Sequence, residues 1–321
     1  MSQINKILLG LLVAQTALGA LTWTSLASKP EPGGSRPVFG YDADKIVSLK
    51  VQSKPRGEND EEKQTVQLAR KDDAWVVADR DEYPTDKDKV QKVLDQLLEL
   101  KIGSALASNP ANHNQLKVGD RDYDRVVTLE TAKEAKTIVV GSGPSKSVNL
   151  RYQGENEVFR AHGMSVWSIN DTVRGYLETK YVEVDKDTLS QAVVSNSNGR
   201  LSFAKQGDKW ALAELPRGKT LNEDKVKNFI NKLTTLTLKE PVGKQQKAEY
   251  GLANGAEVFL VSDGEEGTVT TRYVVGDFRD EQSLYVKADD NDWVVVVSKW
   301  SAEDIRNKGP ADFVKKAKKK E

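Results

Sequence analysis

The sequence predicts an α+β fold: two tandem related modules, each an antiparallel strand-rich meander with one main amphipathic helix, preceded by an N-terminal membrane helix. Three observations support this prediction. Residues 7–26 form an uncharged apolar run, residues 88–100 and 224–236 match as amphipathic helices, and similar short strand-like segments follow both helices. The expected organisation is a transmembrane anchor or signal sequence at 1–27, a Pro/Gly linker at 28–44, a first α+β repeat at 45–187, a second α+β repeat at 188–314 and a basic tail at 315–321.

The N-terminal run Ile7–Leu26 is about as long as a helix that spans a bilayer. Lys6 precedes it and the next charge is Lys29, which places the N-terminus in the cytoplasm and the bulk of the chain outside. A cleaved signal peptide is the alternative, because Ser25-Leu26-Ala27 has the small residues of a cleavage site. The length of the run favours an uncleaved anchor. The cytoplasmic membrane is therefore one expected partner.

Each predicted module contains a hairpin that leads into a helix. Strands at 65–70 and 201–205 are each followed by a polar turn and a strand that begins with a tryptophan, Trp75 or Trp210. Both indoles are expected to pack against the core, because burial of a tryptophan stabilises a small sheet considerably.

The two main helices present the same apolar face, with the spacing i, i+3, i+4, i+7. Thr85 lies three residues before Asp88 and Thr220 three before Glu223, so each helix is expected to begin with a capping box. The matching apolar positions are Val90, Val93, Leu94, Leu97 and Leu100 in the first helix and Val226, Phe229, Ile230, Leu233 and Leu236 in the second.

The remainder of each module is a four-strand meander closed by a short helical segment that a tryptophan leads. Short strands separated by turns indicate antiparallel pairing. The matched pairs are 125–131 with 257–263, 137–141 with 272–276, 148–153 with 283–288, 156–161 with 292–298 and, for the closing segments, 166–177 with 299–309.

Composition excludes several classes of function. Lys+Arg and Asp+Glu are both 48, so the chain lacks the basic face that a nucleic-acid partner requires. The basic tail Lys315–Glu321 is expected to be a solvated end. Absence of cysteine excludes disulfides, thiolate catalysis, cysteine-ligated zinc, iron–sulfur clusters and an acylated lipoprotein anchor.

No pattern of residues indicates catalysis or metal binding. His113 lies in a polar loop and His162 at a strand end, and neither has a partner at metal-ligand spacing. The acidic runs 58–62, 120–124 and 289–292 lack the spacing of a calcium loop and fit solvated turns. No nucleophile elbow of the form G-x-S-x-G occurs. We therefore expect no catalytic, cofactor-binding or metal-ligating residues, and a protein that is not an enzyme.

One stretch, Gly141–Ser147, resembles a phosphate-binding loop but lacks the glycine before its lysine. A strand follows where such a loop needs a helix, and the matching segment after Gly276 loses the lysine and both serines. The stretch therefore indicates a hairpin turn, and no nucleotide partner is expected. Gly141 and Gly276 are expected to supply a backbone conformation at a strand end.

The order of these motifs resembles bacterial envelope proteins of the family named domain of unknown function 4340, in two tandem copies. The resemblance covers Ile46–Phe313 and rests on the tryptophan strand, the Asp-Lys-Val helix, the loop Tyr250-Gly251-Leu252 and the Val-Val-Gly turn. The first copy departs from it, since Gln115-Leu116-Lys117-Val118 replaces the Tyr-Gly-Leu loop. The resemblance implies a single-pass protein of the bacterial inner membrane, with most of the chain in the periplasm or extracytoplasmic space. It carries over no functional residues.

Three hypotheses about function follow. The first is a membrane-anchored extracytoplasmic accessory protein, an auxiliary component of an ABC-type export or gliding-motility-like system that acts through protein contacts. Its edge strands could recruit partners by strand addition. The second is an envelope module that binds a glycan or peptide between the two repeats. The third, an enzyme that uses carboxylates, is least favoured because no polar constellation stands out.

Overall fold

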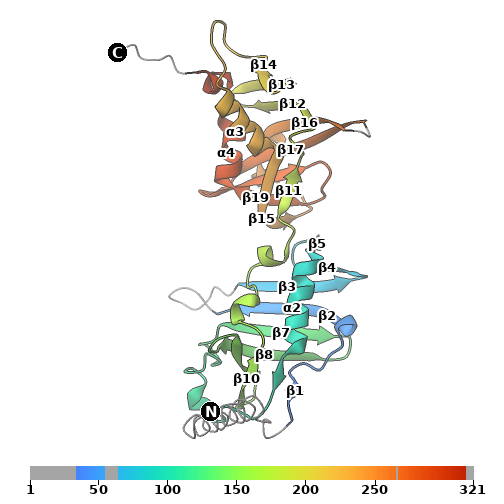
Figure 1. Ribbon diagram of the computed structural model, residues 1–321, viewed down its shortest axis with the longest axis vertical. Helices are drawn as coiled ribbons and strands as arrows, with labels where there is room; N and C mark the ends of the chain where they lie inside the picture. The colour runs from blue at the N-terminus through green and yellow to red at the C-terminus, as the bar shows by residue number, and fades with distance from the viewer. Residues whose placement is uncertain (1–33, 55–63, 265–266, 316–321) are drawn as a thin grey trace, which may run out of the picture.

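The computed structural model describes residues 34–54, 64–264 and 267–315, and it contains two antiparallel sheets. Figure 1 shows the sheets one after the other along the long axis of the molecule. The first sheet has the order β1 (Arg36–Pro37), β6 (Lys101–Ile102), β10 (Val158–His162), β9 (Ser147–Tyr152), β8 (Ala135–Ser142), β7 (Arg125–Thr131), β2 (Ile46–Ser53), β3 (Thr65–Lys71), β4 (Ala74–Val77) and β5 (Tyr83–Pro84). The second has the order β11 (Lys180–Glu183), β15 (Thr235–Gly243), β19 (Val294–Ser298), β18 (Ser283–Ala288), β17 (Gly267–Asp280), β16 (Ala256–Gly264), β12 (Leu189–Asn196), β13 (Gly199–Gln206) and β14 (Lys209–Leu212).

The two sheets have the same strand order. Strands β1 to β4 correspond to β11 to β14, and strands β6 to β10 correspond to β15 to β19, while β5 is an extra edge strand of the first sheet. The main helix has a similar place in both, since α3 comes directly after β14 and α2 comes after β4, the counterpart of β14, and the extra strand β5. A shared order of nine strands, several of them paired across long stretches of sequence, is a topological identity that local turn signals alone do not impose.

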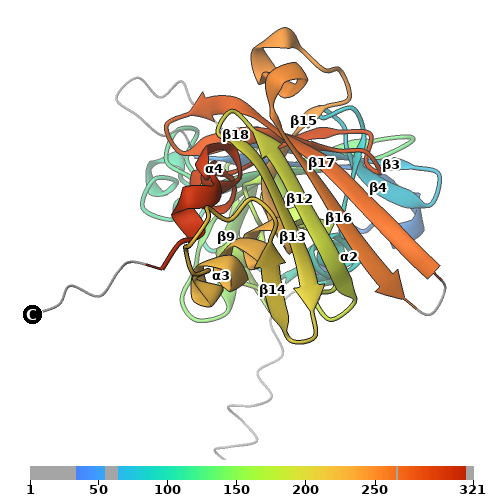
Figure 2. The same cartoon turned by 90° about the horizontal axis from the view of Figure 1, so that it is seen from above.

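Three α-helices lie among the described residues: α2 (Lys87–Glu99), α3 (Glu223–Thr234) and α4 (Lys299–Asn307). The apolar faces of α2 and α3 are buried as their periodicity predicts. Viewed from above, α3 and α4 lie on the same side of the second sheet, in contact with each other (Figure 2). Short 3-10 helices fill the connections: η1 (Ala43–Lys45), η2 (Pro110–Asn112), η3 (Val166–Ser168), η4 (Val173–Tyr176), η5 (Ala248–Tyr250), η6 (Leu252–Asn254) and η7 (Pro310–Phe313).

The caps of the two main helices differ from the prediction. The Asp86 carboxylate accepts hydrogen bonds from the backbone N–H groups of Asp88 and Lys89, at 3.0 and 3.1 Å. In α3 the Asn222 side chain accepts from the Lys225 N–H at 3.1 Å. The predicted cap Thr85 instead donates its hydroxyl to the backbone carbonyl of Trp75. The observed cap therefore lies one residue closer to the helix than Thr85 in α2 and two residues closer than Thr220 in α3.

The main core cluster draws on both sheets, and a separate smaller cluster consists of Val118, Tyr123, Val139 and Val158. At the junction, the rings of Tyr83 and Trp293 meet edge to face with centroids 5.2 Å apart. The Trp293 indole N–H donates to the Asp81 carbonyl at 3.0 Å, and the Asp81 carboxylate accepts from the Lys244 N–H at 2.7 Å. Burial raises the pKa of Tyr83 to about 12. These contacts fasten the β4–β5 turn of the first sheet to the second sheet.

The predicted membrane helix requires correction. Among residues 34–54, 64–264 and 267–315, no helix is both long and apolar enough to cross a bilayer. The structure therefore does not support the N-terminal membrane helix of the predicted fold class or the predicted single-pass location in the inner membrane. The segment Ile7–Leu26, on which both predictions rested, lies outside the described residues. The fold is strand-rich, with two antiparallel sheets and, in the described chain, three α-helices.

Candidate binding groove

The two histidines lie in separate surroundings. His113 is buried in the loop after η2, where its Nε2 lies 2.9 Å from the carbonyl oxygen of Asn156. His162 is exposed at the end of β10. Within the part of the chain that the structure describes, no three His, Asp or Glu side chains are grouped so that they could hold a metal ion.

The acidic runs belong to turns and ion pairs. In the run 120–124, Asp120 pairs with Arg151 at 2.7 Å and Asp122 with Lys117 at 2.9 Å. In the run 289–292, Asp289 pairs with Arg272 at 2.9 Å. The run 58–62 lies outside the described residues. In the two described runs, the carboxylates that form these pairs neutralise neighbouring cations.

The Gly-rich stretch is a hairpin between β8 and β9, in which the Gly143 N–H donates to the Ser147 carbonyl at 3.1 Å. Neither Gly141 nor Gly276 has a positive φ, so the predicted reason for these glycines is wrong. A Cβ on Gly141 would lie 2.3 Å from the Lys117 carbonyl oxygen, and one on Gly276 would lie 2.1 Å from that of Tyr250. Both glycines are required by the close approach of another backbone segment.

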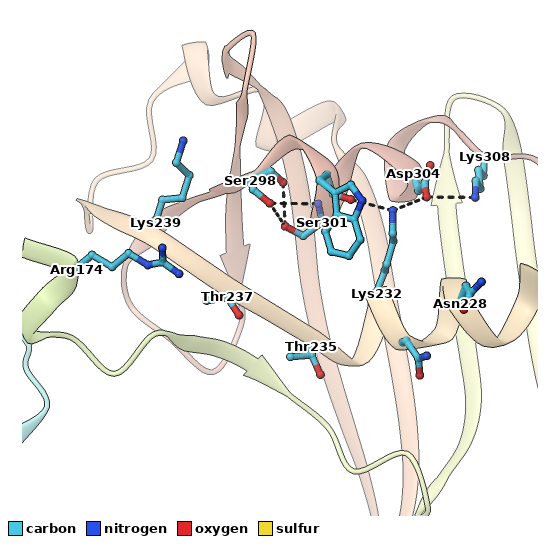
Figure 3. Close-up of a pocket in the computed structure, with 12 residues that line it drawn as sticks. Arg174, Asn228, Lys232, Thr235, Thr237, Lys239, Ser298, Ser301, Asp304 and Lys308 are labelled. Atoms are coloured by element: carbon cyan, nitrogen blue, oxygen red, sulfur yellow. Dashed lines mark hydrogen bonds and ion pairs between the residues drawn. The ribbon is translucent and has the colours of Figure 1, made fainter.

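A polar groove of about 1000 Å³ lies on the second sheet, between β15, the C-terminal part of α3 and the N-terminal part of α4 (Figure 3). Its lining residues come from both halves of the chain, because η4 of the first half contributes one side chain. They are Arg174, Asn228, Asn231, Lys232, Thr235, Thr237, Lys239, Ser298, Trp300, Ser301, Asp304 and Lys308.

The floor of the groove is one face of β15. Thr235, Thr237 and Lys239 line the groove, while Leu236 and Leu238 between them are fully buried in the core. This alternation follows from the two-residue period of a strand, which places successive side chains on opposite faces. The sequence therefore builds a polar floor over an apolar layer.

The wall of the groove is formed by Trp300, whose side chain is 78% exposed. The Lys232 ammonium lies 4.8 Å from the centre of the Trp300 rings and donates to the Trp300 carbonyl at 2.8 Å. It also donates to the Asp304 carboxylate at 2.7 Å, and Lys308 pairs with the same carboxylate at 3.2 Å. Partial burial opposes ionisation of Asp304, but the hydrogen bonds from the two lysines outweigh it and lower its pKa. Asp304 therefore stays ionised and holds the cations of the wall in place.

Two further cations reach the groove without an ion pair among the described residues. Arg174 extends from η4 and Lys239 from β15, and no dashed line joins either to a neighbour in Figure 3. Lys239 lies within electrostatic reach of Asp280 but forms no salt bridge with it. Both cations also line a second hollow of about 680 Å³, which begins at Gln64 and Arg80 of the first sheet. The carboxylates of Asp171 and Glu240 line this hollow too, and they pair with Arg125 and Arg279, so the surface at the junction of the sheets carries both signs of charge.

The exposed tryptophan has a counterpart in the first half of the chain. Trp167 in η3 is 70% exposed, the Arg125 guanidinium lies 5.6 Å from its ring centre, and Arg125 pairs with Asp171 at 3.2 Å. Trp167 and Asp171 have the same four-residue spacing as the tryptophan and aspartate of α4.

Sequence reasoning aligned the two closing segments but did not recognise these tryptophans as surface features. The signal that could have found them is the repeated pattern Trp-Ser-x-x-Asp, at 167–171 and 300–304. Both closing segments are short, so neither has the periodicity from which burial is predicted.

Comparison with known proteins gives one match. A family model described as "Domain of unknown function (DUF4340)" matches residues 75–255, which is more than half of the chain. The matched region begins in β4 and ends just before β16, so it includes parts of both sheets. No curated protein and no solved structure matches the chain.

Proposed function

This chain belongs to the family of the domain of unknown function DUF4340, and on that premise we propose that it is a non-catalytic accessory protein of the bacterial envelope that acts through protein contacts. Its partner in this proposal is a subunit of an ABC-type export or gliding-motility-like system. We propose further that the two halves are tandem copies of one unit. The common strand order and the common Trp-Ser-x-x-Asp pattern support that origin.

The exposed Trp300 is the observation that carries the proposal. Trp300 is 78% exposed beside the groove, so its indole offers a large apolar surface and an N–H donor to another molecule. Tryptophan and arginine are the residues most enriched where binding energy is concentrated, and Arg174 lines the same groove. The contacts of Lys232 with Trp300 hold the wall in one arrangement before a partner binds, which reduces the entropy lost on binding.

Contact through side chains is favoured over strand addition. The edge strands β1, β5, β11 and β14 have only two to four residues each. Short edges offer few free backbone groups and are a usual protection against pairing with another chain. A partner therefore gains more from the groove than from the edges.

A second candidate is an envelope module that binds a glycan or a peptide as its ligand. The observation in its favour is the position of Arg174, which brings the first half of the chain to a groove built mainly by the second half. Ligand sites commonly lie at such junctions.

Co-purification from the native host separates the two candidates. We expect the tagged protein to retain an ABC-type subunit, identified by mass spectrometry, and Trp300→Ala to reduce its recovery by about tenfold, the scale of a binding hot spot. Phe278→Ala is the matched control, since Phe278 is an exposed aromatic outside the groove. Equal recovery with the wild type and Trp300→Ala would contradict the proposal. Recovery of a glycan or free peptide, with no transporter subunit, would favour the second candidate.

A further inference from the structure

We propose that the groove of β15, α3 and α4 binds an acidic polypeptide segment in extended conformation, recognised by Arg174 and Lys239. This inference rests on the proposed function and names the chemistry of the partner. It follows from the charge of the groove, the spacing of its floor, its single exposed aromatic and the way Arg174 is held.

The charge of the groove is the first argument. Its lining contains four cations, Arg174, Lys232, Lys239 and Lys308, against one carboxylate, Asp304. Two of the cations already share that carboxylate. The other two, Arg174 and Lys239, have no acidic partner in the described chain within ion-pair distance. The whole chain carries no net charge, so this surplus is local, and a ligand that supplies carboxylates would complement it.

The floor of the groove provides the second argument. Thr235, Thr237 and Lys239 recur at every second position of β15, which separates successive groups by about 7 Å. Side chains on one face of an extended peptide have the same spacing. A peptide that lies along the strand can therefore place alternate carboxylates near the floor, with Lys239 at one end.

The wall favours a polypeptide over an acidic glycan. Trp300 is the sole aromatic among the lining residues, and the Lys232 ammonium already lies against its ring system. A chain of sugars gains most from several aromatic platforms on which rings can stack, whereas one indole suits a single apolar side chain. We therefore infer an acidic segment that contains one apolar residue.

Arg174 is held in place by contacts of the segment that carries it. The Tyr176 side chain is fully buried, its hydroxyl donates to the Asn170 carbonyl at 2.9 Å, and its own carbonyl accepts from the Asp86 N–H at 2.8 Å. Three residues further along the chain, the Thr179 carbonyl accepts from the Leu238 N–H of β15 at 2.9 Å. The backbone that carries Arg174 is thus fixed relative to both sheets and to the floor, which keeps the side chain within reach of the groove.

The test measures binding of a labelled decapeptide, nine glutamates with one central phenylalanine, by fluorescence anisotropy. We expect Arg174→Glu/Lys239→Glu to weaken binding about tenfold or more, because two attractive contacts become repulsive. Arg121→Glu/Lys133→Glu is the matched control: it makes the same change of charge at two exposed cations outside the groove, and it should alter the Kd less than about twofold. Unchanged thermal melting of both variants would show that folding is retained.

Several outcomes would overturn the inference. The first is no peptide binding by the wild type, and the second is equal weakening in the groove variant and the control, which would indicate a long-range effect of charge. The third is binding of an oligogalacturonate or a ten-nucleotide single strand as tight as that of the peptide. None of these outcomes contradicts the proposed function, which is tested separately by comparing recovery of a transporter subunit with the wild type and with Trp300→Ala. If that comparison contradicts the proposed function, peptide binding can still be measured.

Discussion

Lys117 and Gly251 occupy the same position in the two halves and have the same unusual backbone. Their φ values are 58° and 61°, both in the left-handed region. In the first half the carbonyl oxygens of Lys117 and Leu116 approach Gly141. In the second half the carbonyl oxygen of Tyr250, just before Gly251, approaches Gly276. Glycine adopts this conformation without penalty, whereas lysine pays for it through contact of its Cβ with the backbone. The first half therefore differs from the Tyr-Gly-Leu loop in its residues, while the two halves share the left-handed backbone at this position.

A first prediction concerns the two glycines that the loops approach. Gly141→Ala and Gly276→Ala should each lower the free energy of unfolding by about 1–3 kcal/mol, the usual cost of forcing an atom into occupied space. The new Cβ would lie 2.3 or 2.1 Å from a backbone oxygen, which cannot move aside as a flexible side chain can. Urea titration measures the change. Gly264→Ala is the control, because its nearest atom would be 3.8 Å away. A loss no greater than that of the control would contradict the assignment.

At the scale of the element, the main helices depend on their first turn. Asp86 satisfies two backbone N–H groups that α2 leaves without an internal partner. The hydrogen bond from the Lys89 backbone N–H is the main cause that holds the pKa of Asp86 below its ordinary value. A carboxylate whose pKa is lowered by folding stabilises the protein above its unfolded pKa and loses that effect as the pH falls.

A second prediction follows for Asp86→Ala. It should lower the free energy of unfolding by about 1 kcal/mol at neutral pH, as the loss of a helix cap usually does. The difference from the wild type should vanish as the pH falls from about 4 through the lowered folded pKa, because protonation removes the charged acceptor. Chemical denaturation at a series of pH values measures this. Asp73→Ala removes an exposed carboxylate outside the helix and should have little effect at any pH. A difference that persists in acid would contradict the role of the charge.

At the scale of the whole molecule, two sheets that share an order of nine strands are joined by core packing, by the Tyr83–Trp293 ring contact and by a small polar contact. Asp81 and Glu82 both have positive φ, 49° and 60°, which is strained for residues other than glycine. The strain is compensated where the turn binds the Trp293 indole and the Lys244 backbone. Because the groove receives Arg174 from the first half and its floor from the second, its shape depends on this junction.

A third prediction tests the fastening through two substitutions of one residue. Asp81→Gly relieves the backbone strain but removes the acceptor of the Lys244 N–H, whereas Asp81→Asn keeps an acceptor oxygen and tolerates a positive φ. We expect amide exchange at Lys244 to quicken about fivefold in Asp81→Gly, the factor that corresponds to about 1 kcal/mol. The rate in Asp81→Asn should stay near that of the wild type. Equal rates in both variants would show that the carboxylate does not hold the junction.

The sequence determined the regular elements and much of their correspondence. Residues 88–100 and 224–236 carry a helical period, and α2 and α3 bury the predicted face because an apolar stripe must leave water. The hairpin nature of Gly141–Ser147 followed from the strand pattern after it. The resemblance to the DUF4340 family is confirmed by the family match. The membrane helix and the inner-membrane location are not supported, because no helix of the described residues could span a bilayer. The caps were displaced because several nearby polar residues could serve the same N–H groups.

Only the tertiary structure decided the site. Arg174, Lys239 and Trp300 are far apart in the chain and meet through pairing of β11 with β15 and packing of α4 on the second sheet. The exposure of Trp300 could not be predicted from the sequence either, because an indole is usually buried and a short helix has no periodicity that shows which face is exposed. Local pattern fixes which residues can form an element, since it acts over a few residues. The charged residues of the groove come together through long-range packing, so only the fold shows that they line one groove.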